Sequence, residues 1–474
     1  MDKELYNQTR RQFILNSGMG LGAIALSSML PAKAAEDRIL SQVSHIAPKA
    51  KRVIFLFMAG GPSQHDLFDY KPKLAGLYNE DLQKHLKIPR LSGMTSGKAS
   101  FPIAPSMFDF KQHGQSGHWV SSLLPHTAKV VDELCFIKSM TSIHVNHDPA
   151  ITFLTAGHQF PGRPSIGSWV SYGMGSGNKN LPDYMVLTSA GGYNKAQPLL
   201  SRLWGSGFLP SKYQGVKLRP GKNPILYLKD PGGHDLNDEE IMMKAINELN
   251  QQRYKIVGDT EIQTRISQYE MAARMQTSVP NLTDFSDENE STYELYGEDA
   301  RKPGTFASNC LMARRMAERG VRYVQLFHTG WDHHDDVAKY HPVLCKETDQ
   351  ASAGLVADLK RRGLLEDTLV VWGGEFGRTV FSQGTLKKDA YGRDHHPYCY
   401  TYWMAGGGIK PGFEYGKTDD FSCNVIENPV EVHDLHATMM HLLGFDHERL
   451  TYKFQGRHFR LTDIHGHVLK DIIQ

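Results

Sequence analysis

The sequence has few of the features that identify small metal-binding or disulfide-bonded folds. It contains five cysteines in 474 residues, and no two of them form a Cys-x-x-Cys pair. A zinc ribbon or a dense disulfide framework is therefore disfavoured. The formal net charge is only +2, so the composition gives no reason to expect nucleic acid as a partner.

Sequence motifs of several well-known enzyme classes are also missing. There is no Gly-x-x-x-x-Gly-Lys-Ser/Thr loop, and neither Gly-x-Ser-x-Gly nor His-Glu-x-x-His follows a predicted strand. The glycines of AGGGIKPG follow a predicted strand, but they lack the spacing of a dinucleotide-binding loop. Nucleotide-driven transfer and serine-esterase chemistry are therefore disfavoured.

The N-terminal segment has the pattern of an export signal. Paired arginines at residues 10–11 precede an apolar stretch rich in glycine and alanine, and residues 32–34 (AKA) have the small-x-small pattern of a cleavage site. The apolar run of about a dozen residues is too short to cross a bilayer core of roughly 30 Å, so no stable membrane anchor is predicted. We interpret residues 1–34 as a twin-arginine signal peptide; the alternative is an ordinary amphipathic helix. The export machinery is then a partner, and the mature protein is periplasmic or secreted.

Apolar runs alternate with amphipathic segments along the rest of the chain. The runs indicate buried strands at residues 53–58, 132–140, 183–192, 321–332, 367–377 and 398–408. Helical patterns occupy residues 237–257, 307–320, 345–363 and 429–444. This alternation predicts an α/β fold with a largely parallel central sheet and helices on both faces. Residues 35–474 are predicted to form a single domain with insertions.

Histidines and carboxylates gather where four of the predicted strands end. The carboxyl ends of parallel strands meet at one edge of a sheet, which is where ligands bind. A helix cap, a turn or a solvated loop explains any single cluster equally well, whereas four clusters at equivalent positions favour a shared site. The clusters are His65 with Asp66, residues 144–148, residues 331–336, and the segment from Glu375 to His396.

Carboxylates and imidazoles are the groups that hold a divalent ion at a hydrolytic site. Arg378 and Arg393 are suited to bidentate binding of phosphate or sulfate oxygens, or they serve as counter-ions of neighbouring carboxylates. His433 and His436 lie one turn apart on a predicted helix, where a polar face or the support of a neighbouring site is favoured over metal binding. The predicted metal ligands are Asp66, Asp332, His334, Glu375, Asp394 and His395.

Longer motifs in the chain resemble one protein family. Among them are FMAGGPSQHDLFDYKP, HDPAITFLTAGH, RGVRYVQLFHTGWDHH, GGEFGRTVFSQG and GRDHHPYCYTYWMAGGGIKPG. Over nearly the whole mature chain, the sequence resembles domain-of-unknown-function family 1501, whose members are bacterial, twin-arginine-exported proteins of the alkaline-phosphatase and sulfatase superfamily. The resemblance implies an alkaline-phosphatase-like three-layer sandwich.

The resemblance also implies positions for functional residues. Two departures affect the transfer: no Cys-x-Pro-x-Arg or Ser-x-Pro-x-Arg motif is present to form the formylglycine of ordinary sulfatases, and Phe376 stands where a phosphatase has a metal-binding histidine. The matching positions are Asp66 or His65 for the first ligand, His147 and Thr152 near the nucleophile, Asp332 and His334 for a later acid–histidine pair, and Glu375 and His395 for the last ligands.

We therefore hypothesise an exported hydrolase that acts on a phosphate or sulfate ester of a small molecule or polysaccharide, with Zn, Ca, Mg or Mn as cofactor. Metal-bound water or an unidentified nucleophile attacks, and His147 is a ligand or a base. Arg378 stabilises the developing charge, and Arg393 and His65 bind the substrate. The alternative is a non-catalytic exported protein that keeps the fold and binds carbohydrate or another partner.

Overall fold

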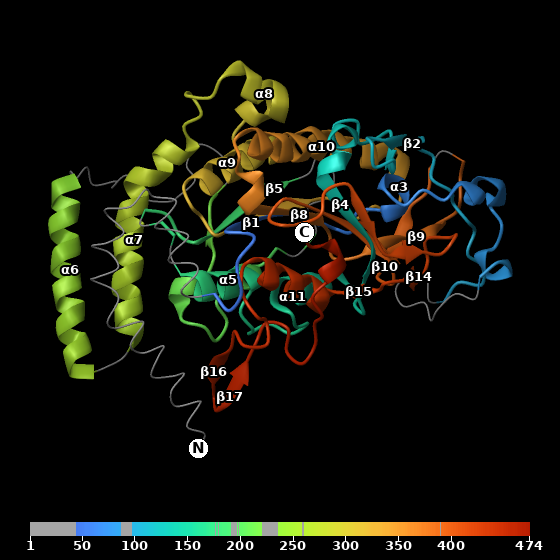
Figure 1. Cartoon of the computed structure of the whole chain (residues 1–474). Helices are drawn as coiled ribbons and strands as arrows, with labels where there is room; N and C mark the ends of the chain where they lie inside the picture. Colours follow the sequence, from blue (N-terminus) through green and yellow to red (C-terminus); the bar gives the residue numbers. More distant parts are fainter. Residues whose placement is uncertain are drawn as a thin grey trace.

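The computed structural model describes residues 44–86, 97–175, 177–178, 180–190, 197, 199–219, 236–257, 260–388 and 390–474. The predicted export signal, residues 1–34, lies outside this part. The strands are β1 (Arg52–Ala59), β2 (Phe110–His113), β3 (His118–Ser121), β4 (Leu134–Thr141), β5 (Tyr184–Ala190), β6 (Val216–Lys217), β7 (Tyr323–Thr329), β8 (Thr368–Gly373), β9 (Gly377–Ser382), β10 (Arg393–His396), β11 (Tyr400–Ala405), β12 (Phe413–Tyr415), β13 (Lys417–Thr418), β14 (Val425–Glu427), β15 (Val430–Glu431), β16 (Tyr452–Phe454) and β17 (Arg457–Phe459). The helices, numbered as in Figure 1, are α3 (Gln64–Leu67), α4 (His147–Ala156), α5 (Ile166–Met174), α6 (Leu236–Val257), α7 (Thr260–Thr283), α8 (Glu290–Tyr296), α9 (Phe306–Glu318), α10 (Val337–Arg361) and α11 (Val432–Leu442).

One nine-stranded sheet forms the centre of the molecule (Figure 1). Its order is β12-β4-β11-β8-β1-β7-β5-β6, and β15 pairs with β4 outside this path. β1 is parallel to both β7 and β8, so that Phe57 stands beside Phe327 and Gly373. Among the described strands of this sheet, β11 alone runs antiparallel to its neighbours. The carboxyl ends of β1, β7 and β8 therefore lie side by side.

Side chains of the central strand alternate between two hydrophobic cores, one on each face of the sheet. Leu56 and Met58 belong to the first core, and Phe55 and Phe57 belong to the second. Every residue of β1 is buried. Burial of both faces explains why the strand is apolar throughout and shows no polar–apolar alternation.

Helices cover both cores. α9 and α10 contribute Cys310 and Leu355 to the first core, and α5 and α11 contribute Trp169 and Leu435 to the second. Figure 1 shows the two pairs of helices on opposite sides of the sheet. The predicted three-layer α/β fold, with a largely parallel sheet and helices on both faces, is confirmed.

Every predicted strand and helix is present, and further helices, among them α4, α5 and α7, were not predicted. The last predicted strand is β11, which is antiparallel. α10 was predicted to begin at residue 345 but begins at Val337. The side chain of the preceding residue, Asp336, caps the helix by accepting a hydrogen bond from the Lys339 amide. Residues between β8 and β11, for which no further strand was predicted, form the ribbon β9–β10, in which His395 pairs with Arg378.

α6 and α7 are long helices that pack on each other beside the sheet (Figure 1). A single domain with insertions over residues 35–474 stays a prediction. Within the part of the chain that the structure describes, no helix combines the length and the apolar character needed to cross a membrane.

Candidate metal centre

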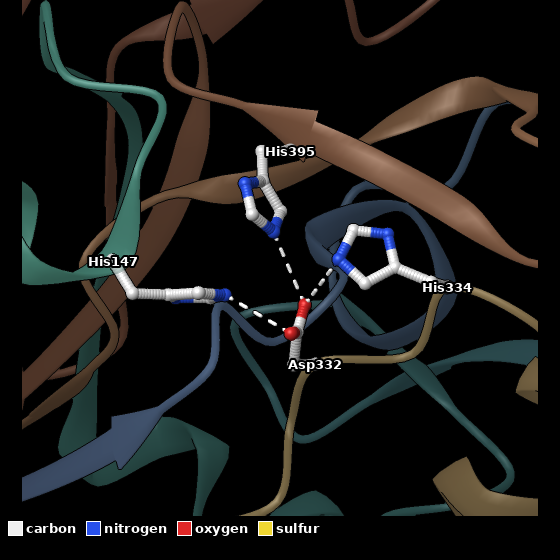
Figure 2. Close-up of side chains that lie close together, drawn as sticks. All are labelled: His147, Asp332, His334 and His395. Atoms are coloured by element: carbon white, nitrogen blue, oxygen red, sulfur yellow. Dashed lines mark hydrogen bonds and ion pairs between the residues drawn. The ribbon is translucent and has the colours of Figure 1, made fainter. Parts of the chain in front are cut away.

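Four side chains converge beyond the ends of β1, β7 and β8, and Figure 2 shows three imidazoles around one carboxylate. Oδ2 of Asp332 lies 3.2 Å from Nε2 of His147. Oδ1 of Asp332 lies 2.8 Å from Nε2 of His334 and 3.1 Å from Nε2 of His395. One possible ligand atom from each residue lies within 4.8 Å of the other three. Segments far apart in the sequence therefore meet in one cluster, which we call the four-residue cluster.

Each member of the cluster stands at the end or the edge of a regular element. His147 is the first residue of α4, Asp332 and His334 follow β7, and His395 lies in β10. The pairing of β10 with β9 places His395 opposite Arg378, the second residue of β9. The rigid sheet, the start of a helix and a short ribbon therefore determine where the four side chains meet.

The Nδ1 atom of every imidazole in the cluster forms a hydrogen bond with an oxygen acceptor. With Nδ1 donating to that acceptor, each ring turns its Nε2 toward Asp332. Three such nitrogens facing one carboxylate need either protons or a cation between them, and this is the arrangement of metal-binding histidines. The acceptors are Glu375 Oε1 for His147 (2.5 Å), the Val145 carbonyl for His395 (2.6 Å) and the Gln383 side-chain oxygen for His334.

The charges of the cluster are strongly coupled. Burial raises the pKa of Asp332, but Arg378 and the surrounding histidines outweigh burial and hold this pKa well below its ordinary range. Burial lowers the pKa of His147, whereas its hydrogen bonds to Asp332 and Glu375 raise it, with a net result of about 9. Burial lowers the pKa of His395 to about 4. At neutral pH and without a bound cation, His147 therefore carries a proton and His395 is neutral.

Arg378 is 1% exposed, and every nitrogen of its guanidinium donates a hydrogen bond to another group of the chain. Nη2 lies 2.6 Å from Oδ1 of Asp332 and also donates to the Gly60 carbonyl. Nε donates to the Gly61 carbonyl at 2.9 Å, and Nη1 to the Arg393 carbonyl at 3.2 Å. These contacts position Asp332 and join the ends of several strands. The sequence-based role of stabilising charge on a substrate stays a prediction.

Glu375, predicted as a metal ligand, lies behind the cluster. Its carboxylate is 1% exposed and accepts hydrogen bonds from the Gly60 amide, at 2.9 and 3.2 Å, as well as from His147. Gly60 has a φ of 117°, and a Cβ atom there would lie 2.6 Å from the Asp332 amide nitrogen. Only glycine allows this close approach of β1 to the segment after β7. In this arrangement Glu375 orients His147 from outside the cluster.

The donor set of the cluster fits a transition-metal ion. Three imidazole nitrogens and one carboxylate oxygen suit zinc and related ions, whereas calcium and magnesium prefer oxygen ligands. In tetrahedral zinc sites, bonds of about 2.0–2.1 Å place ligand atoms about 3.3 Å apart. The separations of 2.8, 3.1 and 3.2 Å around Asp332 are close to this value. Small movements of the side chains would suffice to hold one ion.

Asp66 and Arg393 lie outside the cluster and form a buried ion pair. Nε and Nη2 of Arg393 donate to the two oxygens of Asp66 at 2.7 and 3.0 Å, and Ser63 donates to the same carboxylate at 2.6 Å. Both charged residues are 0% exposed. The sequence-based roles, metal ligand for Asp66 and substrate binding for Arg393, would require this pair to rearrange.

His65 and Asp394 also lie outside the cluster. His65 is 2% exposed, and neither of its ring nitrogens has a hydrogen-bond partner among the residues that the structure describes. Burial lowers the pKa of His65 to about 3. Asp394 is 1% exposed and accepts a hydrogen bond from the backbone amide of His395 at 2.8 Å. Successive side chains of a strand point to opposite faces, so His395 reaches the cluster while its neighbour Asp394 does not.

Sequence reasoning missed the Gln383 and Val145 acceptors and a guanidinium beside α4. Arg202 forms an ion pair with Asp148, which directly follows His147, and its side chain is 27% exposed. The paired residues are 54 positions apart, and no motif connects them. Only the tertiary fold reveals these contacts, because an arginine or a glutamine in a loop carries no pattern of its own.

Two histidines of α11 support the helix that carries His147. Nε2 of His433 donates to the Gly157 carbonyl at 3.0 Å, and Nε2 of His436 donates to the Leu154 carbonyl at 2.7 Å. Both carbonyls lie at the C-terminal end of α4, where main-chain acceptors lack intrahelical partners. The two histidines therefore hold α4 against α11 and lie outside the four-residue cluster.

The sequence as a whole identifies the family. The family model described as "Protein of unknown function (DUF1501)" matches residues 50–473. The chain belongs to this family. None of the curated proteins matches the chain.

Solved structures similar to this member of the DUF1501 family include a sulfatase, a phosphonate monoester hydrolase and an alkaline phosphatase. PsFucS1 sulfatase from Pseudoalteromonas sp. is 12% identical, with a TM-score of 0.35, over 87% of this chain and 72% of that chain. The phosphonate monoester hydrolase SpPMH from Silicibacter pomeroyi is 13% identical, with a TM-score of 0.32, over 83% and 73%. Alkaline phosphatase from the Antarctic bacterium TAB5 is 12% identical, with a TM-score of 0.31, over 78% and 94%.

Proposed function

We propose that this chain is a metal-dependent hydrolase of a phosphate or sulfate ester. The observation that carries the proposal is the convergence of three Nε2 atoms on Asp332, with an oxygen acceptor behind every ring. The nitrogen-rich donor set favours zinc over manganese, calcium and magnesium. When bound, such an ion acts as a Lewis acid toward an ester oxygen and makes water more acidic.

The chain's own residues supply position and charge. Glu375, Val145 and Gln383 keep the rings oriented, and Arg378 keeps Asp332 ionised and in place. The site is therefore organised before a substrate arrives, which is the condition for strong electrostatic stabilisation. The side chains of the cluster are 11% to 21% exposed, so solvent reaches them.

Water is the nucleophile that this arrangement favours. The four-residue cluster contains no hydroxyl or thiol group. Thr152, the hydroxyl that the family resemblance places near the nucleophile, is 4% exposed and donates to the Asp148 carbonyl one turn earlier in α4. Its hydroxyl is therefore committed to its own helix.

The anionic part of the ester has donors beside the cluster. α4 begins at His147, and the N–H groups of His147 and Asp148 precede the first intrahelical hydrogen bond and can attract an anion, whereas Pro149 carries no N–H. Arg202 stands next to this helix start, paired with Asp148 near the surface. If a substrate oxyanion replaced Asp148 as the ion-pair partner of Arg202, Arg202 would bind the ester. The buried Arg378 and Arg393 could take this role only by giving up their present partners.

The test compares two neighbouring aspartates, Asp332→Asn in the cluster and Asp335→Asn, which is exposed. Wild-type protein and Asp335→Asn should retain about one transition-metal ion per chain and hydrolyse aryl phosphates or sulfates, whereas Asp332→Asn should lose both the ion and the turnover. Elemental analysis and a chromogenic ester assay provide the measurements. Stoichiometric metal without turnover on any ester would contradict the proposed hydrolase activity but support the metal site. Metal-free wild-type protein would contradict both proposals.

We also propose that the protein works outside the cytoplasm after twin-arginine export. The support is the sequence of residues 1–34, with its paired arginines and small-x-small site. Replacement of residues 10–11 by two lysines should leave the full chain in the cytoplasm, as measured by fractionation and by the mass of the mature N-terminus. Export of the lysine variant at the wild-type level would contradict this route.

A further inference from the structure

A cavity lies beside the central sheet, between Thr188 of β5, Thr283 of α7 and Asn309 of α9, and we call it the α9 cavity. Figure 1 shows α9 next to both β5 and α7. The cavity has a volume of about 200 Å³, which is room for about six water molecules at roughly 30 Å³ each. None of its lining residues belongs to the four-residue cluster, so the α9 cavity is separate from the metal centre.

The first turn of α9 lines this cavity with a buried amide. Asn309 is 4% exposed, and its Nδ2 atom has no hydrogen-bond partner among the residues that the structure describes. Burial of an amide donor without a partner is unfavourable, and buried polar groups in folded proteins are nearly all paired. The Asn309 side chain therefore indicates an acceptor that enters the cavity from outside the chain.

The start of α9 adds further donors to the same wall. The Thr305 side chain accepts a hydrogen bond from the Ser308 amide at 3.1 Å, and the Thr305 carbonyl accepts one from the Asn309 amide at 3.0 Å. The N–H groups of Phe306 and Ala307 precede this first intrahelical hydrogen bond. They give this end of the helix a positive potential, which attracts an oxyanion.

The charges around the cavity also favour an anion over a cation. Arg219 and Arg301 line it, whereas no aspartate, glutamate or histidine of the described chain does so. Arg219 is exposed. Arg301 pairs with Glu290 and Glu298, but both glutamates are more than three-quarters exposed. Ion pairs as exposed as these are weak, so they leave Arg301 able to attract a ligand anion.

Much of the remaining lining is apolar. Leu187, Leu218 and Met312 line the cavity and are 2%, 2% and 9% exposed. A free inorganic ion would leave these side chains against water, whereas an organic anion would cover them. We propose that the α9 cavity binds a small organic anion, with its oxyanion group at Asn309 and the start of α9 and its apolar body against these three side chains.

The first test is the binding of benzoate to the full chain, measured by isothermal titration calorimetry. Asn309→Asp keeps the size of the side chain but places a carboxylate beside the bound anion, so benzoate should bind about tenfold or more weakly. Asn281→Asp is the matched control, because Asn281 is exposed on α7 and does not line the cavity. Asp332→Asn should bind benzoate like wild type, since Asp332 belongs to the metal centre. Wild-type protein that does not bind benzoate, or equal binding by Asn309→Asp, would overturn the proposal.

The second test separates an organic anion from a bound water or a free ion. Asn309→Leu removes the unpaired amide, and an apolar group of similar size in its place is neutral or stabilising. The Tm of this variant should therefore equal or exceed that of wild type without ligand, whereas benzoate should raise the Tm of wild type alone. An equal rise in both proteins would assign the amide to an ordered water and overturn the proposal.

Inorganic phosphate is the second probe, titrated into Asp332→Asn so that the metal centre does not contribute. Phosphate lacks an apolar body, so it should bind about tenfold or more weakly than benzoate. Phosphate that binds as tightly as benzoate would assign the α9 cavity to a free ion and equally overturn the proposal.

Discussion

Glu375 and His147 share a hydrogen bond of 2.5 Å that joins the segment after β8 to the start of α4. The opposite nitrogen of the same imidazole lies 3.2 Å from Asp332. A carboxylate behind an imidazole fixes the proton on Nδ1 and makes Nε2 a stronger donor to a cation. The Glu375–His147 pair therefore sets both the orientation and the basicity of one side of the proposed metal site.

Replacement of Glu375 by glutamine should weaken metal binding without removing it. Glutamine keeps the size of the side chain but loses the charge that supports His147, and changes of this kind typically cost about 10–100-fold in metal affinity. Competition with a chromophoric chelator measures the dissociation constant. Glu347→Gln is the matched control, because Glu347 also faces a histidine, His328, at 3.2 Å but outside the cluster. Equal affinities of Glu375→Gln and wild type would show that the pair does not support the ion.

Metal affinity should rise with pH because His147 must lose a proton before it can bind a cation. Its pKa of about 9 in the metal-free protein means that binding at pH 6 to 8 displaces this proton. The apparent dissociation constant should therefore fall about tenfold per pH unit from this residue alone, and calorimetry in buffers of different ionisation enthalpy should detect the released proton. His395, with a pKa of about 4, should release none in this range.

The same raised pKa has the opposite effect on the metal-free protein. Its contribution to the stability of the folded state is fully present below the ordinary histidine value of 6.5 and is lost as the pH rises through about 9. Denaturant unfolding of chelated protein at several pH values measures this loss. Metal affinity that is independent of pH, together with flat stability between pH 6.5 and 9, would mean that His147 is not protonated at the site.

The sheet could be predicted from the sequence because each central strand is buried on both faces and is therefore apolar throughout. β1 and β8 show this pattern directly. The orientation of β11 could not be predicted in the same way, since an apolar run has the same composition in a parallel or an antiparallel position. The ribbon β9–β10 was also missed, because its residues are polar and its pairing depends on the strand ends beneath it.

The sequence allowed the prediction that histidines and carboxylates gather at strand ends, but not which of them meet. The distinction between residues in the cluster and residues behind it required coordinates. Asp66 and Asp332 have similar sequence surroundings, but Asp66 is neutralised by Arg393, whereas Asp332 faces three imidazoles. Such differences depend on which partner reaches each carboxylate across more than 300 positions of sequence, as from Asp66 to Arg393.

Removal of one charge from the Asp66–Arg393 pair should destabilise the fold. Both residues are 0% exposed, and Arg393 holds the pKa of Asp66 below its ordinary range even though burial raises it. Asp66→Asn leaves a buried guanidinium without its counter-ion, which typically costs about 3–5 kcal/mol in the free energy of unfolding. Urea unfolding measures the change, and Asp420→Asn, which breaks an exposed pair with Lys73, should have little effect. A small effect of Asp66→Asn would mean that Arg393 finds another acceptor.

His436 should make the folded protein sensitive to mild acid. Burial lowers its pKa to about 3, while Nε2 donates to the Leu154 carbonyl at the end of α4. The unfolded chain takes up a proton near pH 6.5 and the folded chain does not, so the free energy of unfolding is largest above 6.5 and falls as the pH drops toward 3. This one residue should contribute a slope of about 1.4 kcal/mol per pH unit.

The variant His436→Gln tests the slope, because glutamine can still donate to the Leu154 carbonyl but does not titrate. The free energies of unfolding of variant and wild type, measured at pH 6.5, 5.5 and 4.5, should converge as the pH falls. The difference between their pH slopes should correspond to about one proton. His458→Gln, an exposed histidine in β17, should keep the wild-type slope. Parallel pH profiles for His436→Gln and wild type would show that His436 is protonated inside the fold, in which case it could not hold α4 as a neutral donor.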